Sequence, residues 1–143
     1  MNRAILTVLG LTLAAQPAWG EIARVKRSTG TASVERGKAL LPAKPGFVLV
    51  PGDTLVTGKN GQMSLTFVDD TRFAVGPNSR VSVDKFEYNR KSQTGDFQTS
   101  VNRGSLAVVS GQIAHSKQDA MKVRTPTSLL GVRGTRFIVE VPK

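Results

Sequence analysis

Cysteine is absent from the sequence. Its absence excludes disulfide bonds, thiolate nucleophiles, cysteine-ligated zinc and iron–sulfur clusters. It also excludes the acylated cysteine of a bacterial lipoprotein. The chain has 143 residues, which is room for one domain at most. A body of this size buries roughly two thirds of the surface of its unfolded chain, so we expect one hydrophobic core without covalent or metal cross-links.

Long hydrophobic runs are absent apart from one at the N-terminus. A positive start ending at Arg3 precedes an apolar stretch over residues 4–15, and Ala18-Trp19-Gly20 supplies the small residues that signal peptidase accepts. The stretch is too short for the roughly 20 residues that cross a bilayer. The sequence predicts a cleaved signal peptide, residues 1–20. The mature chain from Glu21 is predicted to have no transmembrane segment and to be periplasmic or secreted.

Catalytic side chains are scarce. His115 is the only histidine, and it lies in a polar stretch, residues 111–120. A histidine-dependent hydrolase would need it beside a hydroxyl nucleophile, and no Gly-x-Ser-x-Gly elbow is present. The one adjacent acidic pair, Asp69 and Asp70, is more typical of an Asx turn than of acid–base catalysis. No calcium-loop spacing connects this pair to Asp84. The sequence therefore predicts no enzyme, no catalytic residue, no cofactor and no metal site.

Phosphate-binding and base-stacking motifs are weak. Residues 131–134, Gly-Val-Arg-Gly, lack the Lys-Ser/Thr ending and the strand–helix context of a phosphate-binding loop. The stretch Lys85–Lys91 alternates aromatic and charged residues, as some single-strand binders do. Trp19 lies in the leader and Tyr88 is the only tyrosine, too few for a sugar-stacking surface. Because the chain is predicted to be exported, we expect no nucleic-acid partner.

Acidic residues are outnumbered, 10 to 20, by lysine and arginine. Removing residues 1–20 takes away one basic residue and no acidic one, so the net charge falls from +10 to +9. The basic residues are scattered in small groups without a polybasic run, which is typical of a solvated surface. A cationic exported protein also attracts anionic lipid head groups, envelope polymers and acidic protein surfaces, so these partners remain open.

Hydrophobic residues alternate with a period of two from residue 21 onward. Met63, Leu65 and Phe67 alternate with polar residues, and no helical period persists for three turns. Turn signals such as Pro51–Asp53 separate these runs. We predict one all-β domain, residues 21–143, of many short strands, solenoid-like or sandwich-like, with almost no helix. Exposed loops are predicted at residues 89–96 and 111–120. The predicted strands span residues 22–27, 31–36, 47–50, 54–57, 63–67, 73–75, 81–84, 97–101, 105–110, 121–124 and 135–141.

Four motifs follow one another along the chain. Pro51–Gly58 contains a GD-x-hydrophobic-x-TG turn, Gly61–Thr71 ends in Asp-Asp-Thr, Gly104 begins a Gly-Ser-Leu strand start, and Arg124–Phe137 closes with TP and RGT-x-F. In this order they resemble the FecR domain family of bacterial envelope proteins, over roughly residues 30–141. The family's second turn reads Asp-Gly-Thr, a small departure from the Asp-Asp-Thr of this chain.

The resemblance implies an extracytoplasmic all-β domain without catalytic activity. In well-understood relatives a cytoplasmic segment controls a sigma factor, one helix crosses the inner membrane, and the periplasmic domain responds to an outer-membrane receptor during iron uptake. A cleaved signal peptide leaves nothing in the cytoplasm. We therefore expect the receiver domain without the sigma-regulating role.

The motif residues are predicted to define the fold. The motif glycines are expected to allow a positive φ or a close backbone approach, and Asp53 is expected to cap its own turn. Arg133 either braces neighbouring carbonyls or presents a planar fork to a carboxylate or phosphate. We take Arg124, Arg133 and Arg136 as candidate contacts to a partner or an anion. The structural motif residues are Gly52, Asp53, Gly58, Asp69, Asp70, Gly104, Thr125, Pro126, Gly131, Gly134, Thr135 and Phe137.

Three functions remain open. The leading hypothesis is a non-enzymatic interaction module that binds an envelope protein through a sheet face or an exposed strand edge. An alternative, based on the +9 charge, is an electrostatic binder of an anionic envelope polymer or lipid surface. The third is a sensor of a small anionic ligand, which follows only from the iron-sensing relatives.

Overall fold

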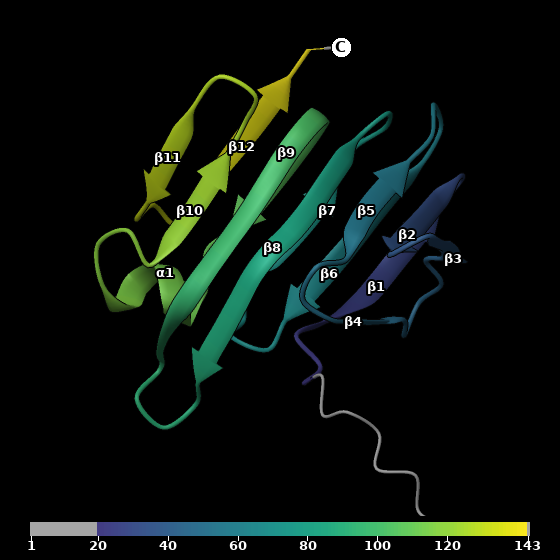
Figure 1. Cartoon of the computed structure of the whole chain (residues 1–143). Coiled ribbons are helices and arrows are strands. Elements are labelled where there is room, and N and C mark those ends of the chain that lie inside the picture. The colour runs from purple at the N-terminus through teal and green to yellow at the C-terminus, as the bar shows by residue number, and fades with distance from the viewer. Residues whose placement is uncertain (1–19, 143) are drawn as a thin grey trace, which may run out of the picture.

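The computed structural model describes residues 20–142, so the predicted signal peptide, apart from Gly20, lies outside the described residues. Strands make up most of this part of the chain, with one short helix (Figure 1). Within it, no helix is long and apolar enough to cross a membrane. The elements are β1 (Ala23–Thr29), β2 (Ala32–Arg36), β3 (Ala39–Pro42), β4 (Val48–Leu49), β5 (Thr54–Thr57), β6 (Gln62–Phe67), β7 (Arg72–Val75), β8 (Arg80–Asn89), β9 (Thr94–Val109), α1 (Gln112–Ser116), β10 (Met121–Arg124), β11 (Leu129–Val132) and β12 (Arg136–Val141).

The strands form one curled sheet in the order β3-β2-β5-β8-β9-β7-β6-β1-β4. Strands β10 and β12 join it at β9, and β11 pairs with β10. The long strand β9 belongs to both sides of the curl. Its N-terminal part pairs with β8 and β10, and its C-terminal part pairs with β7 and β12. We call β3, β2, β5, β8, the first part of β9, β10 and β11 wall B. Wall A consists of β4, β1, β6, β7, the second part of β9, and β12.

The passage of β9 from wall B to wall A depends on Gly104. This residue has a φ of 85°, a left-handed conformation that glycine adopts without steric cost. A Cβ atom at this position would lie 2.1 Å from the Ser79 hydroxyl oxygen. The same hydroxyl accepts a hydrogen bond of 2.9 Å from the backbone N–H of Ser105. The bend is therefore fixed at one residue, and a side chain there would disrupt it.

The core lies between the two walls and contains four phenylalanines. Phe67 and Phe73 come from wall A, and Phe86 and Phe97 come from wall B. The ring centroid of Phe67 lies 4.8 Å from that of Phe97 and 5.5 Å from that of Phe86. Aromatic pairs at these separations stabilise a fold by about 0.5–1.5 kcal/mol beyond the area that they bury. The period of two in the sequence places these rings inward and their neighbours outward.

The prediction of an all-β fold with almost no helix is confirmed. Two of the predicted strands, residues 97–101 and 105–110, are one continuous strand because Gly104 bends β9 without ending it. Half of the predicted loop 89–96 belongs to the β8–β9 hairpin strands, because β8 ends at Asn89 and β9 begins at Thr94. Strands β3 and β11 were not predicted, because exposed leucines on them hide the alternation.

The prediction of an exposed loop over residues 111–120 is wrong in part. This segment contains α1, and Ile113 and Ala114 on the helix are fully buried. The backbone N–H of Ile113 donates to the buried Asp69 carboxylate at 3.2 Å, which attaches the helix to the turn before β7. His115 is exposed on the same helix.

Candidate functional site

Strand register brings two arginines to the outer face of wall A, one on each side of β9. Arg72 on β7 and Arg136 on β12 both lie opposite Val109. Side chains of directly opposite residues share one face of a sheet. Val109 is 37% exposed, whereas Val108 beside it is 2% exposed and points into the core. The two arginines are two strand spacings apart, which is about 10 Å.

The next row on this outer face consists of small side chains. Ala74 on β7 lies between Ser64 on β6 and Ala107 on β9, and Ala107 lies opposite Ile138 on β12. Short side chains flanked by long ones leave a hollow on the surface of a sheet. Ile138 borders this hollow and is 70% exposed, the highest value among the large hydrophobic residues exposed in the described part of the chain.

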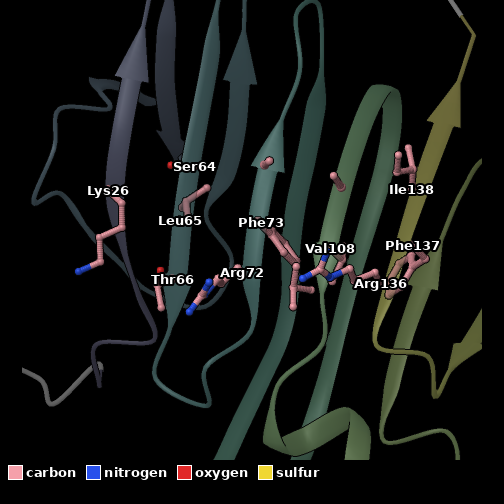
Figure 2. Close-up of a pocket in the computed structure, with 13 residues that line it drawn as sticks. Lys26, Ser64, Leu65, Thr66, Arg72, Phe73, Val108, Arg136, Phe137 and Ile138 are labelled. Atoms are coloured by element: carbon pink, nitrogen blue, oxygen red, sulfur yellow. The ribbon is translucent and has the colours of Figure 1, made fainter.

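These two rows line a groove of about 710 Å³, which we call the wall A groove (Figure 2). Ala74 and Ala107 form its floor, and Phe137 and Ile138 lie at the β12 side. Lys26 projects from β1 at the opposite side (Figure 2). The pairing of β1 with β6 is irregular between Val25 and Arg27, so Lys26 is an extra residue there. Such a bulge redirects a side chain relative to a regular strand.

The charges of the wall A groove are all positive. Among residues 20–142, Lys26, Arg72 and Arg136 line it, and no carboxylate does. None of these three cations belongs to the four ion pairs found within residues 20–142. An unpaired guanidinium beside an apolar surface suits a ligand that carries a carboxylate or phosphate together with an apolar part. The groove can thus bind an amphipathic anion.

The three arginines selected from the sequence do not form one cluster. Arg136 lines the wall A groove, whereas Arg124 is exposed on β10 in wall B and Arg133 is exposed in the connection between β11 and β12. Sequence analysis missed Lys26 and Arg72. Their alternation with buried neighbours indicated outward side chains, but only the strand order brings β1 and β7 to the same face as β12.

Asp53 closes a turn and anchors an arginine. Asp53 is fully buried. Its carboxylate accepts hydrogen bonds of 2.9 Å and 2.8 Å from the Arg36 guanidinium. It also accepts one of 3.0 Å from the backbone N–H of Val50. The hydrogen bond to Asp53 raises the pKa of Arg36. Arg36 additionally lies over the ring of Phe47, with its guanidinium carbon 5.4 Å from the ring centroid.

Asp69 organises a second turn. Its buried carboxylate accepts hydrogen bonds from the backbone N–H of Thr71 at 3.1 Å and from the Thr71 hydroxyl at 2.8 Å, in addition to that from Ile113. The first of these is the hydrogen bond of an Asx turn. Asp70 is exposed and has a φ of 72°, a conformation that aspartate tolerates better than most residues. This pair holds the turn between β6 and β7.

The motif glycines differ from one another. Gly52 and Gly104 have positive φ angles of 91° and 85°. Gly58 and Gly131 are closely approached, because an added Cβ would lie 3.0 Å from the Thr31 Cβ and 2.0 Å from the Asp119 carboxylate. Gly134 has neither feature, because no atom of residues 20–142 lies within 4 Å of such a Cβ and its φ is not positive. The expectation of a positive φ or a close approach is therefore wrong at Gly134, which lies in an exposed connection.

The closing motif spans three elements. Thr125 and Pro126 lie in the turn between β10 and β11, where the Thr125 hydroxyl accepts a hydrogen bond of 3.0 Å from the backbone N–H of Ser128. The carbonyl of Thr135 accepts one of 2.8 Å from the backbone N–H of Ser110, which begins the pairing of β12 with β9. Phe137 is partly buried against the core. This motif therefore joins wall B to wall A.

Asp84 and His115 belong to no candidate metal site within residues 20–142. Within residues 20–142, no three histidine, aspartate or glutamate side chains lie close enough to hold a metal ion. Asp84 accepts a hydrogen bond of 2.8 Å from the Ser82 hydroxyl and another from the Ser100 hydroxyl on the neighbouring strand. His115 lies on α1 and is not among the residues that line the wall A groove.

Comparison with known proteins gives one match. The family model described as FecR protein matches residues 53–143 of the chain. The match begins at Asp53, later than the start near residue 30 expected from the sequence, and β1 to β4 precede it while pairing within the same sheet. No curated protein and no solved structure matches the chain.

Proposed function

The chain belongs to the FecR protein family, and we propose that it is a non-enzymatic receiver module of the bacterial cell envelope that binds a protein partner through the wall A groove. The observation that carries this proposal is an apolar floor bordered by three cations that belong to no ion pair of residues 20–142. We further propose that residues 21–143 form one domain, located in the periplasm or secreted after cleavage before Glu21.

A protein partner accounts for both the charge and the apolar surface of the groove. Acidic side chains on a partner would approach Arg72 and Arg136, and such complementary charges speed association. Aliphatic side chains would cover Ala74, Ala107 and Ile138, which removes apolar surface from water at about 25 cal/mol per Å². A small inorganic anion would use the cations alone.

Site-specific cross-linking tests this function. A photoreactive residue in place of Ala74 in the tagged mature protein, irradiated in its native envelope, is expected to capture one discrete protein that resists a high-salt wash. The double substitution Arg72→Glu/Arg136→Glu is expected to abolish that product. Lys122→Glu/Arg124→Glu on β10 changes the charge equally outside the groove and serves as the matched control.

Three results would contradict the proposal. The absence of any discrete cross-linked protein would show that no protein partner binds at the groove. An equal loss of product in the β10 control variant would show that total charge, and not the groove, determines binding. Turnover of an ester, glycan or phosphate substrate by the purified protein would contradict the non-enzymatic assignment.

A second candidate function is binding to an anionic envelope surface, favoured by the +9 charge of the mature chain and by the unpaired groove cations. This binding would fade between about 0.05 and 0.5 M salt, where the Debye length falls to a few ångströms. Co-sedimentation with vesicles of anionic phospholipid across this range distinguishes it. Salt-resistant capture of a protein supports the receiver module, and a salt-sensitive lipid fraction supports the alternative.

A further inference from the structure

The strand β12 has one free edge within the described residues. It pairs with β9 only, and no other strand of residues 20–142 pairs with it. The hydrogen bond from Ser110 to the carbonyl of Thr135 sets the alternation along this ladder. In an antiparallel pair, every second residue bonds to its neighbour. The N–H and C=O groups of Arg136, Ile138 and Glu140 therefore point away from β9 and remain available.

Wall B extends one strand further than wall A beyond β9. Wall B continues through β10 and β11, whereas wall A ends at β12 (Figure 1). Val123 on β10 is fully buried, and Leu130 lies opposite it on β11, so both side chains share the inner face. Leu130 is nevertheless 47% exposed. The inner face of β11 has no cover from wall A.

A cavity of about 530 Å³ lies between the free edge and this overhang. Val139, Glu140 and Val141 of β12 line one side, and Ser128 and Leu130 of the β10–β11 hairpin line the other. We call this space the edge slot. It combines unpaired backbone groups, which need hydrogen-bond partners, with an apolar side chain that needs cover.

We propose that the edge slot receives one β-strand from a protein partner, added next to β12. The backbone of this strand pairs with Arg136, Ile138 and Glu140. Its alternate side chains face inward as aliphatic residues over Leu130. Those that face outward include an acidic residue opposite Arg136. This inference rests on the proposed function in taking a protein as the partner. The two proposed binding surfaces share Arg136 and Ile138 of β12, whereas Arg72 lines only the groove and Leu130 lines only the edge slot.

A second copy of the chain fits this edge poorly. If the β12 strands of two copies paired with each other, wall A would hold two strands between the two β9 strands, one β12 from each copy. Wall B would have to fit four strands into the same width, β10 and β11 from each copy. At about 4.8 Å per strand the two hairpins would occupy the same space. A single strand, in contrast, matches the overhang of one strand.

A short synthetic peptide tests the edge slot. The peptide Lys-Leu-Thr-Leu-Glu, antiparallel to β12, places both leucines inward, its glutamate opposite Arg136 and its lysine opposite Glu140. The control peptide Lys-Glu-Thr-Leu-Leu has the same composition, but its adjacent leucines cannot both face inward. Each peptide is titrated into the isotope-labelled mature chain, and backbone amide resonances are followed by NMR.

The expected result is selective. The alternating peptide shifts the amides of Arg136, Ile138 and Glu140 and slows their hydrogen exchange, whereas the amides of Phe137 and Val139, already bonded to β9, change little. The control peptide binds at least about tenfold more weakly. Equal binding of both peptides, shifts confined to other residues, or no shift at all would overturn the proposal. Protection of these amides by raising the protein concentration without peptide would assign the slot to a second copy and overturn it as well.

Three variants separate the slot from the fold and from the groove. Ile138→Pro removes the free-edge N–H without removing a bond to β9, and proline is tolerated on such edges; it is expected to abolish peptide binding. Leu130→Asp changes an exposed side chain, so the chain remains folded, and it is expected to weaken binding about tenfold. Arg72→Glu alters the wall A groove only and is expected to leave peptide binding unchanged, so failure of the slot and failure of the groove give different results.

Discussion

The two buried carboxylates of the turns differ from the three cations of the wall A groove in both burial and pairing. Asp53 and Asp69 are 0% exposed, and hydrogen-bond donors surround each of them. Lys26, Arg72 and Arg136 are exposed and belong to none of the ion pairs of residues 20–142. Buried charges must be paired to be tolerated, whereas exposed charges need no partner.

The contrast separates residues that stabilise the fold from residues that are free to bind. Asp53 and Asp69 belong to the family motif, and their acceptor positions are occupied within the chain. Lys26 and Arg72 belong to no motif of the sequence, yet their donors remain available at the surface. The motif therefore describes the architecture, and the residues around it carry the proposed binding. Substitutions graded by burial sharpen this comparison.

The largest effect is expected at Asp69. Asp69→Ala leaves the backbone N–H groups of Thr71 and Ile113 and the Thr71 hydroxyl without their acceptor in a buried site. Buried polar groups without partners cost free energy, so we expect the free energy of unfolding to fall by about 3 kcal/mol. Urea denaturation of the mature protein measures this change. Asp70→Asn, on the exposed neighbour, serves as the control, and a similar loss in both variants would contradict the assignment.

An asymmetric effect is expected at the ion pair of Arg36 and Asp53. The side chain of Arg36 is 41% exposed and that of Asp53 is 1% exposed. Removing the arginine leaves a buried carboxylate with only the Val50 N–H, whereas removing the acid leaves a guanidinium that water can reach. Arg36→Ala is expected to lower the free energy of unfolding by about 2 kcal/mol and Asp53→Asn by about 1 kcal/mol. Equal losses in urea denaturation would show that the buried charge is not the cause.

Much of the fold was open to prediction from the sequence, and most of the site was not. The hydrophobic period of two and the turn signals predicted most strands, because both depend only on residues that are close together in the sequence. The joining of two predicted strands into β9 depends on Gly104 and its contact with Ser79, which are distant in sequence. Likewise, Arg72 and Arg136 meet across Val109 only because β9 lies between β7 and β12. Register and strand order arise from long-range pairing, and local patterns do not contain them.

The smallest effect is expected at the half-buried pair of Glu35 and Arg80. Their side chains form hydrogen bonds of 2.8 Å and 3.1 Å across wall B, and the hydrogen bond from Arg80 lowers the pKa of Glu35. A carboxylate with a lowered pKa stabilises the fold above its unfolded pKa, and this stability is lost as the pH falls through the folded value. Because both side chains are 35% exposed, solvent and salt weaken the contribution.

Glu35→Gln is accordingly expected to change the melting temperature slightly at neutral pH and to flatten its decline in acid. Thermal unfolding between neutral pH and about pH 3 at low ionic strength, comparing this variant with the unmodified mature chain, measures the difference in slope. The difference should shrink when salt is added, since exposed charges are screened. Parallel curves at low salt would show that the pair is only a surface contact. A loss of stability in Glu35→Gln at neutral pH larger than that in Arg36→Ala would contradict the expectation that the more buried ion pair contributes more.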